Sequence, residues 1–304
     1  MKDTKIPWCG HTFSPWIGCT KVSPGCDNCY AEAMDRRFGG EHWGVCVPSK
    51  RTGAAYWRQP LKWNAEAERC RDSGLGTGDG FRTSKPPRPR VFCGSMCDWL
   101  DDEAPIEWLA DLLALIRKTP NLYWLLLTKR PENWGKRLRC AAVELIGKGG
   151  NIAHDWLVES NPPPNVWLGV TVENQAMADK RIPEFLKIPA RVRFLSCEPL
   201  LGAVDLVSAG AMGCNCQDEK RCSGKCSFYR NTIDNRRIDW VICGGESGAN
   251  ARPMHPDWAR SLRDQCAEAG VPFFFKQGSQ NNWKNHSDFS EAPADLQIRE
   301  FPNG

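Results

Sequence analysis

The chain has 304 residues, of which 41% are hydrophobic and 25% are charged, and its 40 Lys and Arg against 36 Asp and Glu give a formal net charge of +4. This composition is typical of a folded globular protein and excludes a disordered chain, and the near balance of charge by itself indicates no polyanionic partner. No apolar run approaches the ~18 residues of a transmembrane helix, and the segment MKDTKIPWCG has no apolar signal core. We therefore expect a cytoplasmic protein with no membrane contact.

Short apolar runs recur along the chain, and most of them end in a polar or glycine-rich tail. Continuous runs of this kind are typical of strands that are buried on both faces of a parallel sheet. The pattern predicts a first strand near 12–16 and a second around Phe92. Five more are predicted within residues 122–131, 166–174, 192–200, 240–248 and 272–277.

Helical patterns lie between these runs. Residues 106–119 place Ile106, Leu109, Leu112, Leu113 and Ile116 on one face, and residues 255–270 end at a glycine typical of a helix C-terminus. Alternation of strands and helices predicts an α/β fold, and six or seven such units fit a partial (β/α) TIM-type barrel of parallel strands. An open doubly wound sheet is the alternative. We expect residues 1–304 to form a single barrel domain that carries an insert at 202–237.

Polar side chains follow most of the predicted strands. In parallel α/β folds, ligands bind at the carboxyl ends of the strands, so these tails are candidate site residues. The alternative is that strand tails are polar because they reach solvent. The candidate site residues at these strand ends are Ser95, Cys97, Thr128, Lys129, Glu173, Glu198 and Glu246, together with the glycines Gly244 and Gly245.

The first of two cysteine groups has the spacing Cys19-x6-Cys26-x2-Cys29 in a loop rich in glycine and proline. Three thiolates suit an iron–sulfur cube with one open iron, whereas a structural zinc site needs a fourth ligand, for which Cys9, His11 or Cys46 are candidates. Free or disulfide-bonded thiols are the remaining alternative.

Several longer segments carry a resemblance to a known family. They include WIGCTKVSPGCDNCYAE, RTGAAYWRQPLKWN, FCGSMCDWL, LLLTKRPENW, RFLSCEPLLG and WVICGGESGANARPMHPDW. With these segments, the sequence resembles a phage-associated three-cysteine-motif family, a domain of unknown function that is similar to radical S-adenosylmethionine (SAM) enzymes. The resemblance covers most of the chain.

The resemblance implies a radical SAM enzyme with a [4Fe–4S] cluster at Cys19, Cys26 and Cys29 and with SAM on the open iron. It implies reduction by a protein such as a flavodoxin or ferredoxin, and hydrogen abstraction from a substrate, with nucleic acid or a nucleotide favoured by the phage context. On this reading, cofactor-binding residues are Ser95, Thr128, Glu173, Gly244, Gly245 and Glu246. The catalytic residues are Cys97, Lys129 and Glu198, of which Cys97 is a candidate hydrogen-atom donor.

The second cysteine group lies in the insert, in a stretch with almost no apolar residue. Its four thiols fit a tetrahedral zinc site or a second iron–sulfur cluster, and a loop with free thiols is the alternative. The residues are Cys214, Cys216, Cys222 and Cys226.

A function of another class also fits part of the sequence. A non-catalytic zinc protein that binds nucleic acid would explain the basic stretch RTSKPPRPR, in which Arg82, Lys85, Arg88 and Arg90 are candidate phosphate contacts, although a solvated basic loop is the simpler interpretation. Purification without oxygen separates the two functions, because the cluster protein is brown and the zinc protein is colourless.

Overall fold

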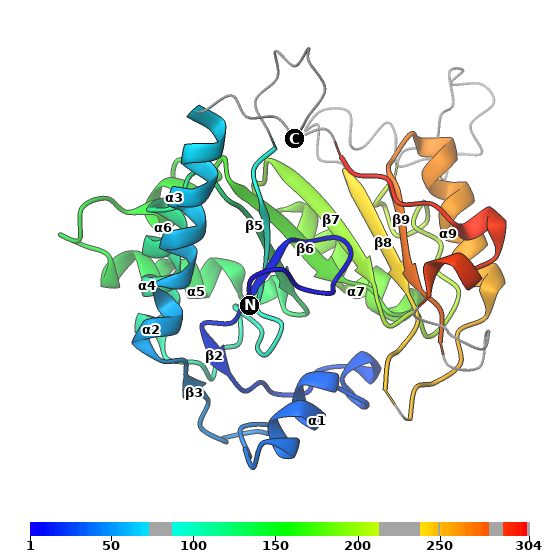
Figure 1. The fold of residues 1–304 in the computed structure, drawn as a ribbon, viewed down its shortest axis with the longest axis horizontal. Coiled ribbons are helices and arrows are strands. Elements are labelled where there is room, and N and C mark those ends of the chain that lie inside the picture. The colour runs from blue at the N-terminus through cyan, green and yellow to red at the C-terminus, as the bar shows by residue number, and fades with distance from the viewer. Residues whose placement is uncertain (73–86, 213–237, 249, 280–287, 303–304) are drawn as a thin grey trace. The chain divides into compact units, whose positions relative to one another are not determined.

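The computed structural model describes residues 1–72, 87–212, 238–248, 250–279 and 288–302 (Figure 1). Its residues group into two compact units. The first unit comprises Met1–Thr20, Gly40–Leu126 and Asn133–Trp167, and the second comprises Lys21–Gly39, Leu127–Glu132 and Leu168–Gly304.

Seven strands form one parallel sheet, in the order β1-β4-β5-β6-β7-β8-β9. Their bounds are β1 His11–Phe13, β4 Arg90–Cys93, β5 Tyr123–Thr128, β6 Val166–Thr171, β7 Val192–Cys197, β8 Trp240–Gly244 and β9 Phe273–Gln277. Each strand pairs with the next one along the chain, whereas the strand order of a doubly wound sheet reverses at a switch point. The curled sheet is that of a partial (β/α) barrel, which confirms the predicted fold class.

The first predicted strand is partly wrong. The strand of the main sheet covers only His11–Phe13, and the chain then enters β2 (Trp16–Ile17), which pairs antiparallel with β3 (Lys50–Arg51) in a separate two-stranded sheet. The intervening Ser14 and Pro15 end β1, since proline has no N–H to donate to a ladder.

Helices connect the strands. Their bounds are α1 Tyr30–Arg37, α2 Ala54–Trp57, α3 Gln59–Asp72, α4 Ile106–Arg117, α5 Trp134–Glu144, α6 Ile152–Leu157, α7 Gln175–Leu186 and α9 Pro256–Ala269. Short 3-10 turns are η1 Pro24–Cys26, η2 Pro131–Asn133, η3 Phe289–Glu291 and η4 Ala294–Leu296. The predicted helices at 106–119 and 255–270 correspond to α4 and α9.

Burial along α4 and the glycine after α9 explain why these two helices form at the predicted positions. The α4 positions Leu109, Leu112, Leu113 and Ile116 are fully buried, as their spacing predicts. Helix α9 ends at Gly270, whose φ of 66° lies in the left-handed region that glycine enters without a Cβ clash. Figure 1 shows α9 beside β8 and β9, with which it is in contact.

The strands of the second unit are buried on both faces. Every residue of β6 and β8 is buried, which explains why these runs show no alternation of apolar and polar residues. Packing is close enough that a Cβ on Gly169 would lie 2.2 Å from the ring of Phe194. Within β6 and β8, side chains that could meet a ligand are therefore expected only at the strand ends.

Among the described residues, no helix is long and apolar enough to cross a membrane. The four cysteines Cys214, Cys216, Cys222 and Cys226 lie outside the described residues, as do Arg82 and Lys85 of the basic loop. The metal site predicted for the insert therefore stays a prediction.

Candidate functional site

The second and third cysteines of the first group lie in the second unit, in a loop that leads into α1. Cys26 ends η1 and is buried, with its Sγ 3.8 Å from the Ser23 Oγ. Cys29 is half-buried and is the N-cap residue of α1. Both thiols are free of disulfide bonds. The first N–H groups of a helix and its dipole present positive charge at this position, where an anionic ligand is favourable.

The loop is held to the end of β6 by Glu173. The Gly25 N–H donates to Glu173 Oε1 at 3.3 Å, and Arg181 Nη1 of α7 donates to Glu173 Oε2 at 2.6 Å. The side chains of Glu173 and Arg181 are 0% and 2% exposed, so this is a fully buried ion pair. Arg181 is thus the ion-pair partner of Glu173 at a place that solvent does not reach. A Cβ at position 25 would lie 3.1 Å from the Glu173 carboxyl carbon, so glycine lets the loop approach this carboxylate without displacing it.

The same loop is held to the end of β8 by Glu246. Asn28 Nδ2 donates to Glu246 Oε2 at 2.9 Å, and the Arg252 backbone N–H and Nε donate to the same oxygen at 2.8 and 3.0 Å. Arg252 Nη2 donates to Oε1 at 2.6 Å. Burial raises the pKa of Glu246, but the hydrogen bonds from Arg252 and Asn28 outweigh it and hold that pKa below its ordinary value. Four donors fill the usual capacity of a carboxylate.

Arg252 joins the strand end directly to the loop. Its Nη2 also donates to the Pro24 carbonyl at 2.8 Å, and its Nη1 lies 3.2 Å from Asp27 Oδ2. Arg252 therefore contacts both ends of the segment that contains Cys26. Sequence reasoning singled out the neighbouring GGESG stretch but missed this arginine, and the signal that was available is the presence of a single cation six residues after Glu246.

The ends of β7, β8 and β9 carry a second polar group in the same unit. Lys276 Nζ donates to Glu198 Oε1, and both side chains are 17% exposed. Gly244 and Gly245 pack beside this ion pair. A Cβ on Gly244 would lie 3.6 Å from the Glu198 carboxyl carbon, and one on Gly245 would lie 2.5 Å from the backbone of Gly278, which follows β9. Glu198, Gly244 and Gly245 thus lie at the strand ends, as predicted, and the ion pair adds Lys276 of β9 to this group.

The predicted residues after β5 have different environments. Thr128 is buried, and its Oγ1 accepts a hydrogen bond from the Arg130 N–H at 2.9 Å. This contact fixes the turn after the strand and occupies the hydroxyl group. Lys129 is half-buried.

The other predicted residues belong to the first unit. Cys19 follows β2, and its Sγ donates to the Thr20 carbonyl at 3.5 Å. The Ser95 and Ser14 hydroxyls are 3.1 Å apart. Cys97 closes a turn onto the Gly94 carbonyl, and burial, followed by the neighbouring Cys93, raises the pKa of its thiol. Cys97 is therefore a neutral thiol at physiological pH.

The side chains considered as a fourth zinc ligand also lie in the first unit. Cys9 is buried beside the Ile6 carbonyl, and Cys46 is exposed. His11 is buried and stacks on Trp63 with ring centroids 4.4 Å apart, and burial lowers its pKa. The neutral imidazole is what a metal ligand requires, but the stacking also gives His11 a packing role.

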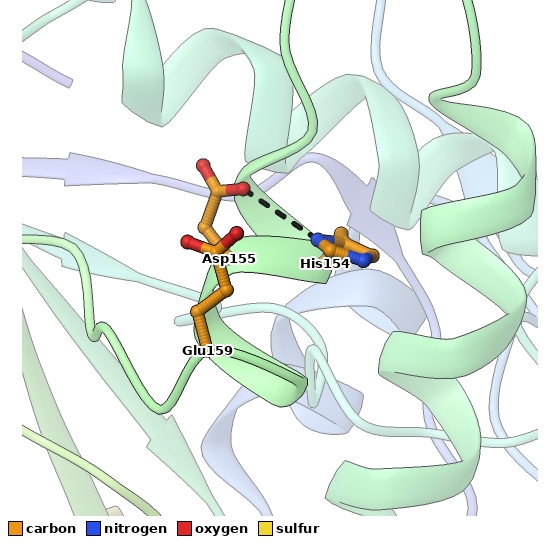
Figure 2. A group of neighbouring side chains, drawn as sticks. All are labelled: His154, Asp155 and Glu159. Carbon is orange, nitrogen blue, oxygen red and sulfur yellow. Dashed lines mark ion pairs between the residues drawn. The ribbon is translucent and has the colours of Figure 1, made fainter.

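Among the described residues, one group of three metal-ligand side chains has its ligand atoms within 4.8 Å of one another, namely His154, Asp155 and Glu159 at the end of α6 (Figure 2). Its side chains are exposed or half-buried, and His154 Nδ1 lies 3.8 Å from Asp155 Oδ1, as in an ordinary surface contact. The three motif cysteines are not such a group. The 4.8 Å limit applies to ligand atoms around a single metal ion. The cysteine sulfurs around an iron–sulfur cube are farther apart, so the limit does not test for such a cluster.

Comparison with known proteins gives one finding. The family described as "Protein of unknown function (DUF5131)" matches residues 3–299, which is nearly the whole chain. The comparisons with curated proteins and with solved structures gave no match.

Proposed function

The chain belongs to this family of unknown function, and from its own residues we propose that it is a radical SAM enzyme with a [4Fe–4S] cluster at Cys19, Cys26 and Cys29. One observation carries the proposal: the loop with Cys26 and Cys29 is fastened to the carboxyl ends of β6 and β8 through Glu173 and Glu246. These ends are where a (β/α) fold binds its ligands.

The residues around the loop fit an anionic cluster. The thiols form no disulfide bond, and Cys29 lies at the positive end of α1. The two carboxylates beside the loop are each paired with an arginine, Glu173 with Arg181 and Glu246 with Arg252, which removes the repulsion that bare carboxylates would exert on thiolates. With reduced cluster and SAM bound, the centre would supply a 5′-deoxyadenosyl radical.

The remaining roles fall to side chains at neighbouring strand ends. The Lys276–Glu198 pair offers an ammonium donor and a carboxylate acceptor to a polar ligand. Gly244 and Gly245 leave the end of β8 without side chains, which lets Glu198 and the backbone of Gly278 pack closely beside these two glycines. Cys97, as a neutral thiol, holds the hydrogen that a donor must provide. Nucleic acid or a nucleotide stays the predicted substrate.

The test is SAM cleavage after purification and reconstitution without oxygen. We expect a brown protein that absorbs near 400 nm (roughly where thiolate-bound iron–sulfur clusters absorb) and that forms 5′-deoxyadenosine when dithionite and SAM are added. Cys26→Ala and Cys29→Ala should abolish both, because two thiolates remain. Cys140→Ala is the matched control, since this exposed cysteine lies outside the motif on α5. A colourless wild-type protein that carries zinc would contradict the proposal and favour the zinc-protein alternative.

A further inference from the structure

Arg137 of α5 is a buried cation with an empty hydrogen-bonding edge. It is 6% exposed, and among the described residues neither its Nε nor its Nη2 has a hydrogen-bond partner. Nε and the adjacent Nη form the edge of a guanidinium that binds a carboxylate or a phosphate through two parallel hydrogen bonds. Burying this edge without an acceptor is costly, because the N–H groups have lost their contact with water.

Two buried indole N–H groups add further donors beside Arg137. Trp134 lies three residues before it on α5, which places both side chains on one side of the helix. Trp99 is fully buried, and both tryptophans contact Trp156 of α6, with ring centroids 6.2 Å away for Trp99 and 5.9 Å away for Trp134. In the part of the chain that the structure describes, the Nε1 atoms of Trp99 and Trp134 have no hydrogen-bond partner. We call Trp99, Trp134 and Arg137 the α5 donor group.

The carboxylates near Arg137 leave this edge empty. Burial lowers the pKa of Arg137, and the charges of the nearby carboxylates only partly offset this effect. These carboxylates belong to Asp101, Asp102 and Glu107, of which Asp101 lies two residues after Trp99. The two oxygens of Asp101 accept hydrogen bonds from backbone N–H groups of other residues. Neither Nε nor Nη2 of Arg137 is therefore bonded to a counter-charge, which an oxyanion at this edge would supply.

We propose that the α5 donor group binds the oxyanion of a small molecule, a carboxylate or a phosphate, through the Arg137 edge and the indole N–H groups. Guanidinium and indole groups only donate hydrogen bonds, so a ligand that only accepts them matches the group and a cation does not. The half-buried Trp134 brings the group to the surface of the first unit, to which all three residues belong. The site needs neither the cluster nor SAM. Ordered water is the other acceptor that could fill these donors.

The test compares Arg137→Met with Arg139→Met, which makes the same change at an exposed position of α5. Inorganic phosphate and acetate are titrated separately into the full chain in chloride buffer, so the two ligand classes are distinguished. Binding is read from the indole N–H resonances of Trp99 and Trp134, assigned with Trp99→Phe and Trp134→Phe. We expect both resonances to shift with at least one of the anions. Arg137→Met should weaken that binding roughly tenfold or more, because two charge-assisted hydrogen bonds are lost, and Arg139→Met should bind like wild type.

A second readout separates binding from a structural role of Arg137. Without ligand, Arg137→Met should unfold at the same urea concentration as wild type or a higher one, because it removes a buried charge that has no bonded partner. The anion should then stabilise wild type and leave this variant unchanged. Binding that Arg137→Met does not weaken would overturn the proposal. It would also be overturned if neither anion binds, as expected when water alone fills the site, or if the ligand-free variant is much less stable than wild type.

Discussion

The ends of β6 and β8 each hold the cysteine loop with one glutamate, but they do so in opposite ways. Glu173 is fully buried, has its own arginine on α7, and accepts one hydrogen bond from the loop, at the Gly25 N–H. Glu246 is paired with the 31%-exposed Arg252, which itself contacts the loop at Pro24 and Asp27. At the end of β6, the loop makes one hydrogen bond to an ion pair that belongs to the core. At the end of β8, residues of the loop are themselves part of the hydrogen-bond network.

The two glutamates therefore have different effects: one supports the stability of the whole fold, and the other positions the cysteine loop. A buried ion pair is costly to break because one charge is left without a partner or water. The Glu246 network contributes less to the whole fold, since its arginine is partly open to solvent and the buried carboxylate has further donors besides that side chain. We therefore expect damage at the β6 end to lower global stability and damage at the β8 end to loosen the loop alone.

The largest effect should follow Glu173→Gln, which leaves Arg181 buried without its counter-charge. We expect a loss of about 3–5 kcal/mol in the free energy of unfolding, measured by urea denaturation of the reduced, metal-free protein. Glu184→Gln is the control on the same helix, because its pair with Lys187 is exposed and should contribute less than about 1 kcal/mol. The double variant Glu173→Gln, Arg181→Met should recover much of the loss. Equal effects of the two single glutamate variants would contradict the distinction.

Arg252→Met should have a smaller and local effect. It removes the two guanidinium donors to Glu246 and the contacts to Pro24 and Asp27, while the backbone N–H of residue 252 and Asn28 still donate to the carboxylate. We expect opening of residues 23–29 to become easier by about 2 kcal/mol, read by hydrogen exchange with mass spectrometry, with global stability little changed. Arg260→Met, which removes an arginine paired with Asp257 and Asp295, should leave exchange in the loop as in wild type. Uniform faster exchange across the second unit would show that Arg252 supports the whole fold.

Acid should weaken the β8 end next. The pKa of Glu246 in the folded protein is below its ordinary value of 4.5, because hydrogen bonds from Arg252 and Asn28 outweigh the effect of burial. A carboxyl group whose pKa is lowered in the folded protein stabilises the fold fully above its ordinary pKa. This stabilisation is lost as the pH falls through the lowered pKa. Protection of the loop against exchange should therefore be complete above pH 4.5 and be lost as pH falls below that ordinary value. Glu246→Gln should flatten this dependence, and an unchanged acid response in that variant would assign it to another group.

The smallest effect should follow Asn28→Ala. This change removes one hydrogen bond to Glu246 and one to the Asn250 carbonyl, while Arg252 continues to hold the carboxylate. We expect loop opening to become easier by about 1 kcal/mol, less than in Arg252→Met. An effect larger than that of Arg252→Met would mean that Asn28, and not the arginine, is the main link between the loop and β8.

The sequence predicted the strands well because their signal is local. Six of the seven predicted runs each contain a whole strand of the main sheet. The prediction near 12–16 was partly wrong, because the strand there is short and ends before Pro15. The glutamates were found because they follow strands. Their partners were missed because they depend on the folded chain: Asn28 and Glu246 are 218 residues apart. Helix α1 was missed because its apolar residues face solvent, so its pattern does not resemble that of a buried helix.

The central claim is that the loop of Cys26 and Cys29, held at the ends of β6 and β8, binds an iron–sulfur cluster with an open iron. The most direct measurement is the electron paramagnetic resonance spectrum of the reconstituted, dithionite-reduced protein before and after SAM is added. The account predicts a [4Fe–4S]⁺ signal that changes shape with SAM in the wild type and in Cys140→Ala, and no such signal in Cys26→Ala. A wild-type protein without this signal, or a signal that SAM leaves unchanged, would contradict it.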